Sequence, residues 1–159
     1  ELKASMSKEE WKDYKKKQAD ASKQRRREAQ LAMDSGDERY LLPRDRGEER
    51  RYIRNLVDSK RYINNLMMPL ALALLVVMLF GNKFPAVAAM ISTGALVVIL
   101  VFLLEGILLG RKAARMAREK FPHTSESAFS LGFYAYGRAT QPRRWRTPKP
   151  QVNIGDKVS

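Results

Sequence analysis

Two long apolar runs dominate the pattern of hydrophobic and polar positions along the chain. The first covers residues 66–80 and the second residues 86–109, with the sequence GNKFP between them. At about 1.5 Å per residue the second run is ~36 Å long, enough to cross the ~30 Å hydrocarbon layer of a bilayer. The first run reaches a comparable length when it is extended back to Tyr62. The pattern predicts two membrane-spanning helices, at about 64–80 and 86–109, joined by a tight turn.

The alternative is a buried helical hairpin in a water-soluble protein. Outside the two runs the hydrophobic residues are scattered or narrowly striped, so the rest of the chain supplies no faces to cover them. Pro69 is compatible with a helix because it falls in the first turn after Asn64 and Asn65, where its missing N–H has no intrahelical partner. We therefore expect an all-α membrane protein, a two-helix transmembrane hairpin (residues 66–110) with cytoplasmic helical and extended arms.

Basic residues lie on both outer flanks of this hairpin, and the turn contains only Lys83. The flanking basic residues are Arg50, Arg51, Arg54, Lys60 and Arg61 before the hairpin, and Arg111, Lys112, Arg115, Arg118 and Lys120 after it. Such a bias favours a cytoplasmic position for the basic flanks. We expect a multi-pass protein of the plasma membrane with both termini in the cytoplasm.

The first segment of the chain, residues 1–35, is rich in charges of both signs. Ser7 and Glu10 have the spacing of a capping box, which predicts a cytoplasmic helix over 7–33. Although the whole chain has a net charge of +13, acidic residues interrupt the Lys and Arg runs of this segment. A solvated helix or loose attraction to anionic lipid therefore fits better than binding of nucleic acid, which we do not expect.

Residues 36–48 form a linker, and residues 49–65 follow it as an amphipathic segment. The exposed apolar residues Leu41 and Leu42 in a polar linker suggest docking on another surface. In the amphipathic segment, Tyr52 and other apolar residues share one helical face with arginines around it, as in a helix lying in the membrane interface. A plain cytoplasmic extension of the first spanning helix explains the pattern equally well.

Two segments follow the hairpin. Residues 111–121 continue as a basic helix, which Pro122 ends. Residues 122–159 comprise an aromatic segment and a basic extended tail that prolines keep from folding into a helix. The aromatic residues fit an anchor at the membrane surface or, equally well, a contact that fills a groove on a partner. The arginines and tryptophan of the tail fit lipid phosphate or an acidic protein surface.

Small residues and one acid distinguish the second apolar run. Pairs such as Ala88 with Ser92 and Gly106 with Gly110 are four residues apart, a spacing that lets another helix approach closely. For the Ala, Ser and Thr pairs, packing against the first helix of the same hairpin is the simpler interpretation. For Glu105 the simpler interpretation is a salt bridge with a nearby basic residue such as Arg111, and the sharper ones are an intersubunit ion pair or a proton or quinone site.

The composition excludes several classes of chemistry. The sequence has no cysteine and one histidine, which removes disulfides, thiolate metal sites and histidine clusters. It also has no phosphate-binding glycine loop, serine nucleophile elbow or paired catalytic carboxylates. We expect no enzyme activity, no cofactor and no metal site.

Several short stretches resemble an actinobacterial family of two-helix membrane proteins of unknown function. They are Tyr40-Leu41-Leu42-Pro43-Arg44-Asp45-Arg46-Gly47, Arg51-Tyr52-Ile53-Arg54, Val57-Asp58-Ser59, Met68-Pro69, Leu109-Gly110-Arg111, Gly132-Phe133-Tyr134-Ala135 and Arg143-Arg144. The resemblance covers about residues 40–150. It implies an accessory subunit beside the cytochrome bcc complex and cytochrome oxidase, with no catalytic residue.

These observations favour a non-catalytic accessory subunit that stabilises or helps assemble the respiratory supercomplex, in a hetero-oligomer and in contact with anionic phospholipids. The alternative is a membrane-tethered module whose basic arms recruit anionic lipid, RNA or a soluble protein. The candidate contact residues for a partner or lipid are Leu41, Leu42, Arg44, Arg46, Tyr52, Ala88, Ser92, Glu105, Gly106, Gly110, Arg111, Phe133, Tyr134, Arg143, Arg144, Trp145 and Arg146.

Overall fold

The computed structural model describes residues 6–158, and the first five residues of the predicted segment 1–35 lie outside it. The described residues are helical and form no β-strand, which confirms the all-α expectation. The α-helices are α1 (Lys8–Asp34), α2 (Glu48–Asp58), α3 (Met67–Phe80), α4 (Pro85–Lys120) and α5 (Ala128–Ala139). Short 3-10 turns lie at Pro43–Asp45, Ile63–Leu66, Gly81–Lys83 and Arg143–Trp145.

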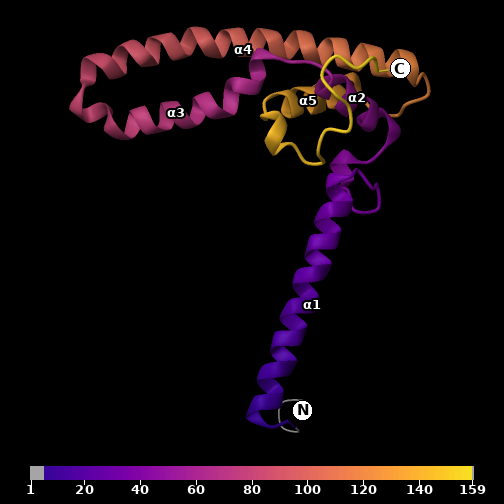
Figure 1. Cartoon of the computed structure of the whole chain (residues 1–159). Helices are drawn as coiled ribbons and strands as arrows, with labels where there is room; N and C mark the ends of the chain where they lie inside the picture. Colours follow the sequence, from indigo (N-terminus) through magenta and orange to yellow (C-terminus); the bar gives the residue numbers. More distant parts are fainter. Residues whose placement is uncertain (1–5, 159) are drawn as a thin grey trace.

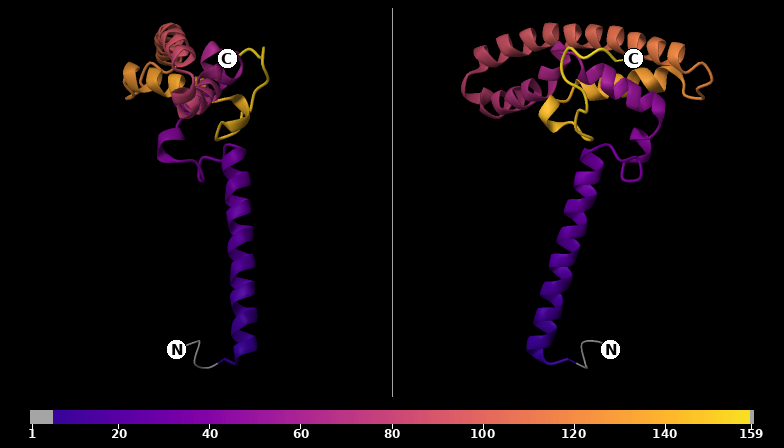
Figure 2. Two further views of the ribbon diagram at one scale, coloured as in Figure 1. Left: turned by 90° about the vertical axis from the view of Figure 1, so that its left-hand side faces the viewer. Right: turned by 45° about the vertical axis from the view of Figure 1, so that its right-hand side comes forward.

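Helix α1 projects away from the other helices and buries none of its residues (Figures 1 and 2). Its start confirms the predicted capping box. The Ser7 hydroxyl accepts a hydrogen bond from the Glu10 N–H at 3.3 Å, and the Ser7 N–H donates to the Glu10 carboxylate at 2.8 Å. The last residue of α1, Asp34, contacts Lys149 and Gln151 of the tail, but no residue of the helix is buried, so local terms such as the cap are its main support within the chain.

Helices α3 and α4 form the predicted hairpin and lie along one another in Figure 1. Two segments are long and apolar enough to cross a membrane, Ile63–Phe80 with 18 residues and Pro85–Lys120 with 36. The spanning run 86–109 and the basic helix 111–121, which the sequence divided into separate segments, are one continuous helix, α4. No proline interrupts the chain at the change from apolar to basic residues, and Gly110 at this point does not adopt the positive φ of a helix end, so the helix continues through it.

The core of the protein lies where α2, α5 and the second half of α4 meet. Its apolar members include Ile53, Val57, Leu109, Leu131 and several alanines. Ala113 and Ala117 of α4 and Ala135 and Ala139 of α5 have no exposed area, and these small side chains let the two helices approach closely. We call this region the base of the hairpin: α2, residues 102–120 of α4, α5 and residues 140–158.

The apolar face of α2 is part of this core. Tyr52, Ile53, Leu56 and Val57 are buried against α4 and α5. The sequence suggested that this face lies in the membrane interface or extends the first spanning helix. In the structure the face is covered by the chain itself, because α5, which is distant in sequence, supplies the second apolar surface that the local pattern did not reveal.

Candidate functional site: the base of the hairpin

Helices α4 and α5 cross at the base of the hairpin, and glycines lie at their point of contact. A Cβ atom added to Gly132 would lie 2.9 Å from the Gly110 carbonyl oxygen, and one added to Gly110 would lie 3.1 Å from the Gly132 carbonyl oxygen. Gly106 is covered by the ring of Tyr136, which a Cβ atom there would approach to 2.5 Å. The sequence assigned Gly106 and Gly110 to a partner or lipid contact, but both are buried under α5 of the same chain.

Glu105 binds the segment that leads into α3. Its carboxylate accepts hydrogen bonds from the Ile63 N–H at 2.9 Å, the Asn64 N–H at 2.7 Å and the Asn64 side-chain amide at 2.7 Å. The Asn64 amide also donates to the Phe102 carbonyl oxygen at 3.1 Å. The predicted salt bridge to Arg111 is absent among the described residues, because the carboxylate satisfies the free N–H groups at the start of the α3 segment instead.

A buried ion cluster ties the tail to α2. The Asp58 carboxylate accepts two hydrogen bonds from Arg138, at 3.0 and 2.6 Å, and one from Arg146 at 2.6 Å. Arg143 donates to the backbone oxygens of Asp58 and Val152. Burial lowers the pKa of the Arg146 guanidinium, and the Asp58 carboxylate opposes that effect. The tail arginines Arg143 and Arg146, predicted to contact lipid or a partner, therefore bind within the chain.

A second polar contact joins the linker to α2 and α5. The Tyr134 hydroxyl donates to the Asp45 carboxylate at 2.8 Å, and Arg54 donates to the Asp45 carbonyl oxygen. Burial raises the pKa of Tyr134. Leu41 is 2% exposed, so the docking predicted for the linker occurs on the protein itself. Leu42 is 47% exposed and remains outside this contact.

The other predicted contact residues divide between packed and exposed positions. Tyr52 is buried in the core, Glu105 and Tyr134 are half-buried, and Ala88 is half-buried near Gly81. Ser92 is exposed, and its hydroxyl donates back to the Ala88 carbonyl oxygen at 2.8 Å, so this small residue does not pack against α3. The exposed members on the base and linker are Arg44, Arg46, Arg111, Phe133, Arg144 and Trp145.

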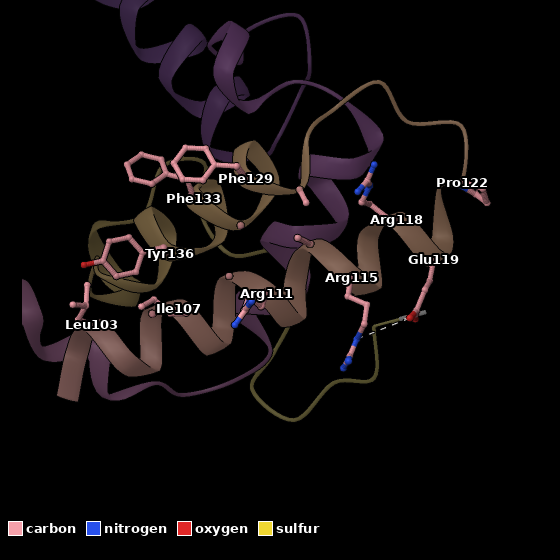
Figure 3. A pocket seen from close by; sticks show the side chains of 15 residues that line it. Leu103, Ile107, Arg111, Arg115, Arg118, Glu119, Pro122, Phe129, Phe133 and Tyr136 are labelled. Atoms are coloured by element: carbon pink, nitrogen blue, oxygen red, sulfur yellow. Dashed lines mark ion pairs between the residues drawn. The ribbon is translucent and has the colours of Figure 1, made fainter. Parts of the chain in front are cut away.

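A groove of about 1110 Å³ opens between α4 and α5 (Figure 3). Leu103, Ile107 and Tyr136 lie towards one end, and Arg111, Arg115 and Arg118 follow along α4. Phe129 and Phe133 of α5 lie on the side of Tyr136, with their own ring centroids 6.0 Å apart. The groove therefore combines a long apolar wall with a row of cations.

A second, smaller cleft of about 550 Å³ separates α3 from α4. Its lining is apolar and comes from both helices, with Leu70 and Ala73 on α3 and Val97 and Val101 on α4. The two helices of the hairpin thus stand apart above the base, and Val97 and Val101 of α4 remain exposed on the side that faces α3.

The buried partners Asp58, Asn64 and Arg138 were missed at the level of sequence. The available signal was weak: Asp58 directly follows the apolar residues Leu56 and Val57 on the face of α2 that is buried, where an unpaired carboxylate would be costly. That position implies a cationic partner, but it does not say which of the many arginines supplies it.

Comparison with known proteins identifies relatives of most of the chain. A family model described as "Protein of unknown function (DUF3043)" matches residues 2–156. An uncharacterized protein of Mycobacterium tuberculosis strain H37Rv is 46% identical over 138 residues, which cover 87% of this chain and 57% of the relative. An uncharacterized protein of Mycobacterium leprae is 45% identical over 138 residues, which cover 87% of this chain and 59% of the relative.

The chain spans less than two thirds of the length of these curated relatives. No solved structure matches it. The matches support the family resemblance but not the finer likeness to a respiratory supercomplex subunit, because the printed names of these relatives mention no complex.

Proposed function

This chain belongs to the family of proteins of unknown function DUF3043, and we propose that it is a non-catalytic accessory subunit that packs on a large membrane complex. The hairpin of α3 and α4 would lie in the bilayer, and the base of the hairpin would lie at the cytoplasmic face. In this function the protein stabilises the complex or helps to assemble it.

The observation that carries the proposal is the uncovered surface of the hairpin. Only 6% of the most apolar 18-residue window of each helix is buried within the chain. In water such a surface would drive aggregation, whereas in a bilayer it is matched by lipid tails or by other helices. The folded base does not shield it, because its helices cover only the second half of α4.

The small residues of α4 favour contact with another protein helix over contact with lipid alone. Ala89, Ser92 and Thr93 are exposed, and both hydroxyls donate to backbone carbonyls of their own helix. Their polar groups therefore need no further partner, and their small size allows the backbone of a second helix to approach closely.

The internal use of the tail arginines favours an accessory subunit over a recruiting arm. Arg143 and Arg146 of the tail, together with Arg138 of α5, bind Asp58 and nearby backbone oxygens, so they hold the tail against α2 and α5. A rigid base at one end of an uncovered hairpin fits a subunit that inserts beside a complex and braces its cytoplasmic side.

The partner that we propose is the cytochrome bcc–cytochrome oxidase supercomplex, which the sequence resemblance implies. The test is purification of the tagged full chain from an actinobacterial membrane in mild detergent, followed by mass spectrometry of the proteins that remain bound. We expect subunits of both respiratory complexes to be enriched over an untagged control.

Matched variants of α4 sharpen this test. Ala89→Leu with Thr93→Leu fills the exposed small-residue face and should reduce the recovered partner, because a close helix approach becomes impossible. Val87→Leu with Met90→Leu changes exposed side chains that are already large and should leave recovery unchanged. Recovery of the wild-type chain as a free monomer would contradict the accessory function, and recovery with another complex would contradict the supercomplex as partner.

A further inference from the structure

We infer that the groove between α4 and α5 binds an anionic diacyl phospholipid of the surrounding bilayer, with its phosphate at the arginines of α4 and an acyl chain along Ile107 and Phe133. The inference rests on the membrane placement proposed above and goes beyond it, because it assigns a defined lipid site. The groove has a volume of about 1110 Å³, which is ample for a headgroup and part of an acyl chain.

One face of α4 changes from apolar to cationic along the groove. Leu103, Ile107, Arg111 and Arg115 follow one another at intervals of four residues, and Arg118 comes three residues later. Residues at this spacing share one side of a helix. Arg111 follows Ile107 after ~6 Å of helix. In a phospholipid a similar distance separates the carbonyl carbon of an acyl chain from the phosphate.

Helix α5 forms the wall of the groove opposite α4. It can do so because small residues of α4 lie beside the face that carries Ile107 and Arg111. Gly106, Gly110 and Ala114 let α5 pack closely on α4, and this packing places Phe133 next to Tyr136, with their ring centroids 6.4 Å apart. Phe129 is 81% exposed and Phe133 is 64% exposed, although both are large and apolar. Such exposed aromatic surface in a groove calls for an apolar occupant.

The charge of the groove is complementary to a phosphate. Arg115 has a weak exposed contact of 4.0 Å with Glu119, and neither Arg111 nor Arg118 forms an ion pair among residues 6–158. Three arginines against one glutamate leave an excess of two positive charges. Basic pockets at the ends of membrane helices on the cytoplasmic side bind the headgroups of anionic lipids.

The order of apolar and cationic residues along the groove favours a lipid over a peptide. The apolar run of α4 ends at Leu109, and Arg111 is the first charge that follows it. The apolar end of the groove therefore faces the predicted hydrocarbon layer and the cationic end faces the predicted headgroups, as in an inserted phospholipid (Figure 3). A soluble acidic peptide would match the arginines but not the apolar end.

The test is lipid binding by the purified full chain, measured by native mass spectrometry in mild detergent. Phosphatidylglycerol and phosphatidylcholine with identical acyl chains are added in turn, so only the headgroup differs. We expect phosphatidylglycerol to bind about tenfold more tightly. In the triple variant with Arg111→Gln, Arg115→Gln and Arg118→Gln, that tenfold preference should be lost, since the groove then has no excess of positive charge.

The matched control removes the same charge from α1 by Arg25→Gln with Arg26→Gln and Arg27→Gln, all exposed, and should keep the preference. For the apolar wall, Phe133→Ser should weaken phosphatidylglycerol binding, whereas Phe84→Ser, with the same exposure of 64%, should not. Equal binding of the two lipids, an equal loss in the α1 variant, or a copurified polypeptide that protects the groove would overturn the lipid site.

Flotation with vesicles of phosphatidylcholine alone separates this inference from the proposed function. A chain that floats with these vesicles but shows no headgroup preference keeps its membrane placement and loses the lipid site. A chain that does not float loses both.

Discussion

At the scale of single residues, Glu105 shows how a charge in an apolar run can have a structural use. Three N–H groups of Ile63 and Asn64 converge on its carboxylate within 2.9 Å. These donors include backbone groups at the start of the α3 segment, which the helix itself leaves free. Glu105 thereby joins the first residues of one arm of the hairpin to the middle of α4.

We predict that Glu105→Gln destabilises the protein. An amide in place of the carboxylate brings its own N–H donors against the three donors that the site presents, and hydrogen bonds to a charged group are worth about 1.5–3 kcal/mol. The free energy of unfolding, measured by denaturant titration in mild detergent, should fall by about 2 kcal/mol.

Glu119→Gln is the control, because the Glu119 side chain is 69% exposed and its ion pair with Arg115 is 4.0 Å long. It should leave stability unchanged. If Glu105→Gln instead kept full stability but impaired respiration in the intact membrane, the carboxylate would act in proton or quinone chemistry and not as a cap.

At the scale of elements, the crossing of α4 and α5 depends on two glycines that touch through their backbones. Gly132→Ala places a Cβ atom 2.9 Å from the Gly110 carbonyl oxygen, so α5 must move away from α4. We expect a loss of about 1–3 kcal/mol in the free energy of unfolding, the usual cost of overpacking.

Gly137 provides a matched control in the same helix. A Cβ atom there meets nothing within 4 Å, so Gly137→Ala should stabilise α5 by about 0.5–1 kcal/mol through helix propensity alone. Destabilisation of similar size in both variants would show that α5 tolerates neither change for local reasons, and the proposed close crossing would be wrong.

The contact between α2 and the start of α5 should make stability depend on acid. The Ser130 hydroxyl and the Arg50 guanidinium hold the pKa of Glu126 below its ordinary value of 4.5. Because the unfolded chain then binds a proton more readily, the stabilisation is complete above pH 4.5 and is lost as the pH falls through the lower folded pKa.

We therefore expect Glu126→Gln to have a lower melting temperature than the wild type at pH 7, and we expect this difference to shrink as the pH falls below 4.5 and the wild-type carboxylate takes up a proton. Melting curves of both proteins across this range test the effect. A difference that stays constant with pH would mean that the charge of Glu126 contributes nothing to the contact.

At the scale of the whole molecule, the charges predict a direction in the membrane. The base of the hairpin and its flanks contain most of the basic residues, while the turn between α3 and α4 has only Lys83. Helix α1 runs crosswise to α4 in Figures 1 and 2, so a spanning α4 would leave α1 alongside the membrane face.

Site-specific labelling can test this direction cleanly because the sequence has no cysteine. We expect Lys83→Cys to react with a membrane-impermeant thiol reagent added to intact cells. Lys23→Cys in α1 and Arg144→Cys in the tail should react only after permeabilisation, since their segments lie on the basic side. Labelling of Arg144→Cys in intact cells would contradict the proposed orientation.

The sequence alone determined the features that depend on neighbouring residues along the chain. The capping box at Ser7, the helical hairpin and its turn follow from local spacing, apolar runs and turn residues, and the structure has them. The amphipathic face of α2 was also visible, although what covers it was not, because a local pattern shows which face is apolar and not which surface meets it.

Only the tertiary structure decided which distant residues meet. Asp58 binds Arg138 across 80 positions in the chain, and Glu105 reaches back 41 positions to Asn64. A charge pattern cannot choose among many arginines, and a pair of glycines does not say whether its close neighbour belongs to the same chain. Those choices depend on the packing of α5 into the small-residue face of α4, and that packing leaves the groove and the two sides of the hairpin open.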